Sequence, residues 1–124
     1  MIATATPPVT ISIDLKKSRI RIHKSLLHAM GNPKYIQLLV HPNNKFVAIH
    51  AIDKSEPGDQ SERITPLDMM AENSFELYSK AFINKLCELI EGLNPECTYR
   101  LYGKIMTSHN MAVFPLNTIT PVET

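Results

Sequence analysis

Five basic side chains stand close together near the start of the chain, and only one acidic residue, Asp14, accompanies them. In residues 19–23 charged and apolar side chains alternate, and along a strand this alternation points every second residue to the same side at ~7 Å intervals. Regularly spaced cations on an ordered backbone suit a polyanion such as the phosphate backbone of duplex DNA. The predicted nucleic-acid-binding residues, together called the basic edge, are Lys16, Lys17, Arg19, Arg21 and Lys24.

The alternative interpretation of the basic edge is the ordinary solvated face of a sheet, which is also rich in charge. A second basic group has the same two interpretations. Arg100, Tyr102 and Lys104 alternate with other residues, so they share one side of a predicted strand and form a secondary basic patch. An exposed amphipathic strand face, stabilised by cross-strand pairs, is the alternative for this patch.

No residue pattern indicates catalysis or a bound metal ion. His23 and His28 lie on either side of a predicted strand-to-helix boundary, so they do not share a helix face as metal ligands at i and i+4 do. His41 and His109 fall in predicted turns. The chain has four glycines and lacks a glycine-rich phosphate loop, a nucleophile elbow and a His-Glu-x-x-His motif. We therefore expect no enzyme activity, no cofactor and no metal.

Composition favours a folded, cytoplasmic protein. Hydrophobic residues make up 44% of the 124 residues, which is enough for a core in one domain. Cys87 and Cys97 lack the spacing of a disulfide framework or a metal site. The first residues lack the features of a signal peptide, and no stretch is long and apolar enough to span a membrane. Residues 53–76 contain seven acidic and two basic residues, a polarity that would orient the protein on an anionic partner or align it with a second copy.

Hydrophobic alternation predicts a hairpin made of residues 9–15 and 19–23 with a basic loop between them. Ser25 is the predicted N-cap of a short helix over residues 26–30, and Gly31 is expected to end that helix. The first part of the chain thus reads as two strands followed by about one turn of helix.

A second predicted hairpin consists of residues 35–40 and 45–52, around a turn rich in Pro and Asn. Residues 53–73 lack the periodicity of a strand or a helix for most of their length, and we interpret them as an acidic linker. Within this linker, residues 65–68 have the Thr-Pro start of a helical turn.

A longer helix is predicted after the strand-like residues 74–78, with Ser79 as its N-cap and Gly92 at its end. Apolar residues recur along it with a period of 3.6, so they form one stripe that must pack on other elements. Cys87 lies on this stripe and is expected to be a small buried thiol. The stripe consists of Phe82, Ile83, Leu86, Cys87, Leu89 and Ile90.

A third hairpin follows that helix, made of residues 98–106 and 111–116. Pro115 places the second of these strands at a sheet edge or marks its end. Strand, helix and hairpin therefore occur twice in the same order, over residues 19–52 and 74–117, which predicts an internal duplication; the alternative is a chance order of elements in an α+β chain.

When the two units are aligned by element, Glu76 stands where Arg21 stands, so the second unit lacks the basic face of the first. The expected fold class is α+β, with a mostly antiparallel sheet and duplicated strand-helix-hairpin units in one compact domain. Its expected parts are residues 1–52 with the leading strand, the acidic linker 53–73 and residues 74–124.

The run from Ser18 to Gly31, Ser-Arg-Ile-Arg-Ile-His-Lys-Ser-Leu-Leu-His-Ala-Met-Gly, is followed by a hairpin and resembles the AbrB-like swapped-hairpin domain of bacterial transcription regulators. The duplication resembles the MraZ family, in which two such units share one polypeptide. In this chain Ser18 replaces the usual Gly, and His23 and Lys24 replace the usual Pro before the helix. A two-repeat sheet similar to that of the TATA-binding protein is the alternative.

The resemblance implies a β-rich, swapped-hairpin barrel that forms a homodimer or a higher homo-oligomer and binds duplex DNA. It implies that Arg19 and Arg21 meet the DNA, with Lys24, Lys16 and Lys17 nearby. We therefore predict a DNA-binding module, such as a bacterial transcription regulator or an antitoxin-like factor, without a membrane partner. The alternative is a protein–protein interaction or assembly module that uses exposed strands and charge asymmetry.

Overall fold

Alternating apolar and polar residues build most of this chain into strands, and the seven predicted strands are confirmed to within one residue at each end. The computed structural model describes residues 9–52, 61–64 and 74–122. The helices and strands, in chain order, are β1 (Val9–Asp14), β2 (Arg19–His23), α1 (Lys24–Ala29), β3 (Tyr35–His41), β4 (Phe46–Ile52), β5 (Ser61–Arg63), β6 (Ser74–Tyr78), α3 (Lys80–Leu89), β7 (Thr98–Met106), β8 (Met111–Pro115) and β9 (Thr120–Pro121).

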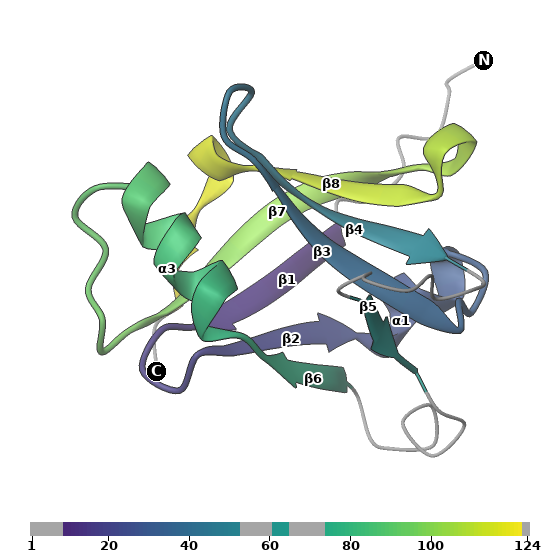
Figure 1. Ribbon diagram of the computed structural model, residues 1–124, viewed down its shortest axis with the longest axis horizontal. Coiled ribbons are helices and arrows are strands. Elements are labelled where there is room, and N and C mark those ends of the chain that lie inside the picture. The colour runs from purple at the N-terminus through teal and green to yellow at the C-terminus, as the bar shows by residue number, and fades with distance from the viewer. Residues whose placement is uncertain (1–8, 53–60, 65–73, 123–124) are drawn as a thin grey trace.

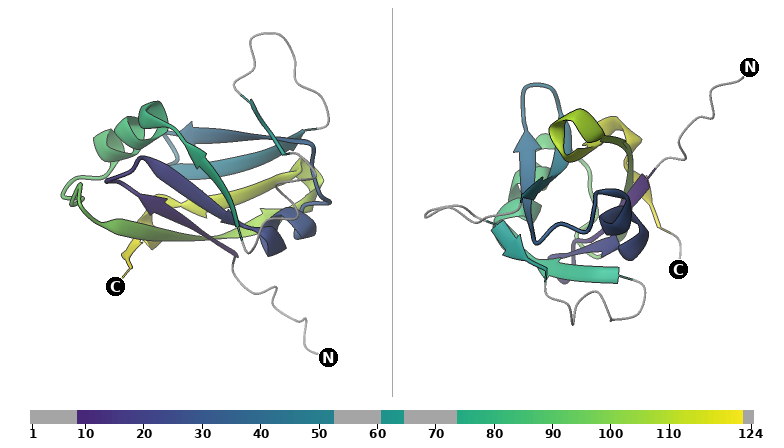
Figure 2. Two further views of the ribbon diagram at one scale, coloured as in Figure 1. Left: turned by 90° about the horizontal axis from the view of Figure 1, so that it is seen from below. Right: turned by 90° about the vertical axis from the view of Figure 1, so that its right-hand side faces the viewer.

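The described strands form one antiparallel sheet that curls into a half-barrel (Figures 1 and 2). The order across the sheet is β5-β3-β4-β8-β7-β1-β2-β6, and β9 pairs with β7. The protein is therefore mixed α+β with a mostly antiparallel sheet, as predicted. The predicted order of strand, helix and hairpin occurs as β2-α1-β3-β4 and again as β6-α3-β7-β8.

The two halves of the chain are joined through strand pairs rather than packed side by side. Strand β2 pairs with β6, β4 pairs with β8, and β1 pairs with β7. Each of these pairs joins a strand from the first half to a strand from the second. The core is consequently shared by both halves.

Strand β7 connects the two parts of the curled sheet. Residues 98–103 pair with β1, and residues 104–106 pair with β8. Gly103 stands at the change of partner, where a Cβ atom would overlap the carbonyl oxygen of Val113 and lie 2.6 Å from Cδ2 of Phe114. A glycine at this position allows the neighbouring backbone to approach closely as the sheet bends.

The inner face of the sheet carries the hydrophobic core. Ile20, Ile22, Ile49 and Phe114 are fully buried there, together with residues from every long strand. The helices lie at opposite ends of the sheet (Figure 1): α1 buries two leucines and α3 buries Phe82, Ile83 and Leu86. Full burial of an aliphatic side chain contributes about 1.5–3 kcal/mol. The two helices therefore cover the two ends of the apolar interior that the curled sheet encloses.

The start of α1 differs from the prediction of Ser25 as N-cap. The helix begins at Lys24, and its N-cap is His23, whose Nδ1 accepts a hydrogen bond from the backbone N–H of Ser25 (3.1 Å). A ring nitrogen can satisfy an amide that has no partner within the helix, in the same way as a capping hydroxyl. Gly31, with φ of 87°, follows the helix as predicted.

The stripe on α3 is confirmed except for one residue. The Ser79 hydroxyl accepts from the backbone N–H of Phe82 (3.1 Å), so Ser79 is the N-cap as predicted. Leu86 is fully buried, but Cys87 is exposed, and the prediction of a buried thiol is wrong. One residue along a helix is a rotation of about 100°, which carries Cys87 past the edge of the buried face.

Two short strands were not predicted. Strand β5 lies inside the interval 53–73 that we interpreted as a linker, and it pairs with β3, with Arg63 opposite Tyr35. The three residues of β5, Ser-Glu-Arg, have no apolar alternation, so only their pairing with β3 reveals a strand. Strand β9 pairs with β7 in the same way. The helical turn predicted at residues 65–68 lies outside the described residues.

Candidate nucleic-acid interface

Strand β2 presents its basic residues on the outer face of the sheet. Ile20 and Ile22 are fully buried on the inner face, while Arg21 and His23 are exposed. Arg19 shares the outer face and is half-buried. The alternation predicted for residues 19–23 is therefore confirmed, because it is the apolar residues that select which side faces the core.

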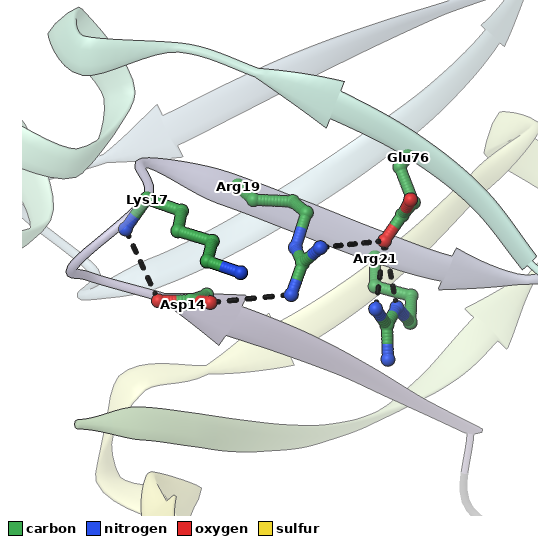
Figure 3. Close-up of polar contacts among 5 residues, drawn as sticks. All are labelled: Asp14, Lys17, Arg19, Arg21 and Glu76. Carbon is green, nitrogen blue, oxygen red and sulfur yellow. Dashed lines mark hydrogen bonds and ion pairs between the residues drawn. The ribbon is translucent and has the colours of Figure 1, made fainter.

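Arg21 is held by an acidic residue from the second half of the chain. Antiparallel pairing of β2 with β6 places Glu76 directly opposite Arg21. The Nε and Nη2 atoms of Arg21 both donate to Oε2 of Glu76, at 3.0 and 2.8 Å (Figure 3). Close pairing of opposite charges across strands stabilises a sheet by a few tenths of a kcal/mol to about 1 kcal/mol.

Arg19 lies between two carboxylates (Figure 3). Its Nη2 donates to Oδ2 of Asp14 at 3.2 Å, and its Nη1 is 3.4 Å from Oε2 of Glu76. The other carboxylate oxygen of Asp14 accepts from the backbone N–H of Lys17 at 3.1 Å, which closes the turn between β1 and β2. Asp14 and Glu76 thus fix the positions of both guanidinium groups and offset much of their charge.

The remaining members of the basic edge are spread over two elements. Lys16 and Lys17 are exposed in the turn between β1 and β2, and Lys16 forms a salt bridge of 3.4 Å with Glu96. Lys24 is half-buried at the start of α1. Among the described residues, neither Lys17 nor Lys24 forms a salt bridge. Three of the five predicted residues are therefore engaged by carboxylates, and the edge is not an open row of unpaired cations.

The residues of the secondary basic patch lie at different distances from the basic edge. Arg100 stands on β7 opposite Ser12 of β1, and Ser12 stands opposite Arg21 of β2. Two strand spacings of about 4.8 Å separate Arg21 from Arg100, with only the short serine between them. Lys104 lies beyond Gly103, where β7 pairs with β8, and is exposed.

A hollow of about 240 Å³ lies over Ser12 on this outer face. It brings Arg100 of the secondary patch together with Arg19 and Arg21 of the basic edge, a juxtaposition that strand order alone produces. No salt bridge joins Arg100 to any carboxylate in the described part of the chain. The residues of this arginine hollow are Ser12, Asp14, Arg19, Arg21, Thr98, Arg100 and Val122.

The charges at the hollow do not cancel. Among the residues that the structure describes, three guanidinium groups face two carboxylates, those of Asp14 and Glu76, and the guanidinium without a carboxylate partner in this set is that of Arg100. Each guanidinium carries five N–H groups, of which the carboxylates use only some. The hollow is therefore electropositive and rich in hydrogen-bond donors, a combination that suits an oxyanion.

Sequence reasoning missed the roles of Ser12, Asp14 and Glu76. A signal for Glu76 was present, because the alignment of the two units put it at the position of Arg21. When equivalent strands pair antiparallel about their centres, only the two central residues face their own equivalents, and Arg21 and Glu76 are these central residues. No local pattern could have placed Ser12 beside Arg100, since the two residues are 88 positions apart in the sequence.

Other chemistry is not assembled in the described ranges. No group of three or more His, Cys, Asp or Glu residues there is arranged to hold a metal ion. His23 caps α1, and His41 stacks on Phe46 with ring centroids 4.9 Å apart. Neither described helix is long and apolar enough to cross a membrane.

Comparison of the chain with protein-family models, with curated proteins and with solved structures finds no match.

Proposed function

We propose that this protein is a DNA-binding module that contacts the phosphate backbone of duplex DNA with the outer face of β2, β1 and β7. The observation that carries the proposal is the convergence of Arg19, Arg21 and Arg100 around Ser12. Arginine is the side chain best suited to planar, two-point recognition of phosphate, and fixed arginines lose less side-chain entropy on binding. A role as a transcription regulator or antitoxin-like factor is part of the proposal and is supported by the resemblance of residues 18–31 alone.

The distribution of charge along the chain supports an anionic partner. Residues 14–28 contain five Lys and Arg residues and one acidic residue, whereas residues 53–76 contain seven acidic and two basic residues. The basic charge is therefore concentrated near β1 and β2, although the whole chain has a formal net charge of only +1. A basic surface attracts nucleic acid and accelerates association at low salt.

Swapped, duplicated units are the second part of the proposal. In the pairing of β2 with β6, the middle residues Arg21 and Glu76 are opposite each other. In the pairing of β4 with β8, Ala48 is opposite Val113, and the partners on either side are arranged evenly about this pair. Both pairings fit a local two-fold axis that relates the first unit to the second, as the swapped-hairpin, AbrB-like interpretation requires.

The proposal is tested with fluorescence anisotropy of a labelled, mixed-sequence DNA duplex over a series of salt concentrations. Two or three phosphate contacts, made by Arg100, Lys17 and one partly engaged arginine, predict a log–log slope of about −2 to −3. Arg100→Ala should weaken binding and make this slope less steep by about 1. Lys85→Ala is the matched control, because Lys85 lies on α3 and pairs with Glu88. Equal affinities for the wild-type protein and Arg100→Ala at low salt would rule out this face.

One observation favours a second candidate, an assembly module. On the outer side of β3, β4 and β8, Leu39, Ala48 and Val113 stand in one row; Leu39 is 38% exposed, Val113 is half-buried and Ala48 is buried. A large apolar side chain that is exposed, as Leu39 is, would be covered in a protein–protein contact. A homo-oligomer formed through this row would be dissociated by Leu39→Asp, as measured by light scattering, whereas a monomeric wild-type protein would contradict the candidate.

A further inference from the structure

We propose that the arginine hollow is a binding site for a single phosphate group, here called the phosphate seat, and that Arg100 is the principal residue that binds the phosphate. The inference deepens the proposed function and rests on it for the choice of phosphate as the ligand. Ser12 makes the seat possible, because its short side chain stands in the row between Arg21 and Arg100. A longer residue at this position would fill the space above the strand.

The lining of the hollow is organised before any ligand binds. Asp14 and Glu76 hold Arg19 and Arg21 through contacts of 2.8 to 3.4 Å. Asp14 is the one carboxylate among the described residues that line the hollow, and its two oxygens are already occupied by Arg19 and by the backbone N–H of Lys17. These two carboxylates thus position Arg19 and Arg21, and neither of them forms a salt bridge with Arg100.

The chemistry of the lining matches a phosphate better than a carboxylate. Guanidinium groups approach from β2 on one side and from β7 on the other, and the hydroxyl groups of Ser12 and Thr98 belong to the strands beneath. A tetrahedral anion offers oxygens in several directions at once, and at neutral pH a terminal phosphate carries a charge of about −1.5 to −2. Val122 closes the side next to Thr98, whose carbonyl oxygen accepts from the backbone N–H of Val122 (2.9 Å).

The test is a titration of the full chain with inorganic phosphate at constant ionic strength, in which binding is measured by the amide chemical shifts in NMR spectra. The expected result is saturable shifts at Ser12, Thr98 and Arg100, and binding weaker by about tenfold or more in Arg100→Ala. Arg100→Lys keeps the charge but not the planar fork, so it should restore only part of the affinity.

A second variant separates the shape of the hollow from its charge. Ser12→Ile retains every charged group and suits a strand, but its side chain fills the hollow, so phosphate binding should be lost. Thr10→Ile is the control, because Thr10 lies on the same outer face of β1 but does not line the hollow. Absence of saturable shifts in the wild-type protein, or equal phosphate binding by the two isoleucine variants, would overturn the proposal.

The source of the phosphate group is resolved with two oligonucleotides of the same sequence, one with a 5′-phosphate and one with a 5′-hydroxyl. Tighter binding of the phosphorylated strand, abolished by Ser12→Ile, identifies a seat for a terminal phosphate. Equal binding of both strands, weakened in both by Ser12→Ile, identifies a seat for an internal phosphodiester. Phosphate binding without duplex binding would support the phosphate site and contradict the proposed DNA-binding function. Duplex binding without phosphate binding would support the DNA-binding function and contradict the phosphate site.

Discussion

Glu76 is the residue that most changes the net charge of the basic edge, because it forms salt bridges with two of its five members. Its Oε2 atom contacts both Arg19 and Arg21, so it offsets the charge of Arg21 and shares the charge of Arg19 with Asp14. The Arg21 side chain is 48% exposed and that of Glu76 is 32% exposed, and exposed pairs of this kind contribute about 1 kcal/mol or less to stability. The pair therefore matters more for the electrostatic potential of the face than for the stability of the fold.

Glu76→Gln should raise DNA affinity with little effect on folding. Glutamine keeps the size of the side chain but removes the charge, which releases Arg21 for phosphate and leaves Arg19 paired with Asp14. The log–log salt slope of binding should become more negative by about 1, and the free energy of unfolding should fall by less than about 1 kcal/mol. Fluorescence anisotropy and urea denaturation measure the two quantities.

The control for this substitution is Glu88→Gln, which also removes one negative charge but lies on α3 next to Lys85. It should leave the salt slope unchanged. An identical rise in affinity in both variants would mean that net charge alone, and not the release of Arg21, determines binding.

At the scale of elements, β7 decides how the outer face is divided. Its first part pairs with β1 and brings Arg100 beside Ser12, while its last part pairs with β8 and carries Lys104 away from the hollow. The change of partner occurs at Gly103, where the backbone of β8 comes too close for a side chain. The predicted group of Arg100, Tyr102 and Lys104 is therefore a single strand face that serves two parts of the sheet.

Gly103→Ala should destabilise the protein by about 1–3 kcal/mol, because the added methyl group would overlap the Val113 carbonyl oxygen and crowd Phe114. Urea denaturation provides the measurement. Gly92→Asn is the comparison: Gly92 has φ of 84°, but a Cβ atom added there would meet nothing within 4 Å, and asparagine tolerates this backbone conformation. A Gly103→Ala variant as stable as the wild-type protein would contradict the close approach of β8.

At the scale of the whole molecule, the two halves of the chain cannot form their cores separately. The pairs β1·β7, β2·β6 and β4·β8 all cross between halves. The inner faces of strands from both halves contribute to one hydrophobic cluster that includes Ile22 and Phe114. Stability is therefore expected to be shared between the halves rather than divided between two units.

We accordingly predict one cooperative unfolding transition for both halves. Native-state hydrogen exchange should give the same opening free energy for core amides of β2 and of β8, within experimental error, because small domains with a shared core unfold as a unit. Exchange of the β8 amides at a much lower free energy than those of β2 would contradict this interleaved architecture.

Local patterns in the amino-acid sequence determined much of this protein. The alternation in residues 19–23 set a strand and its outer face, Ser79 set the start of α3, and Gly31 set the end of α1. These features depend on backbone geometry and on neighbours a few residues away, and such interactions are visible in a short window of sequence. Strand β5, whose three residues are polar, had no such signal.

Only the tertiary structure decided which strands became neighbours. The strand pairing places Glu76 opposite Arg21 and places Ser12 between Arg21 and Arg100. The predicted row of cations is therefore a hollow in which carboxylates hold and partly neutralise Arg19 and Arg21. The physical reason is that strand pairing joins residues far apart in the chain, and the preference of any one strand for its partner arises from burial of a common core rather than from its own residues.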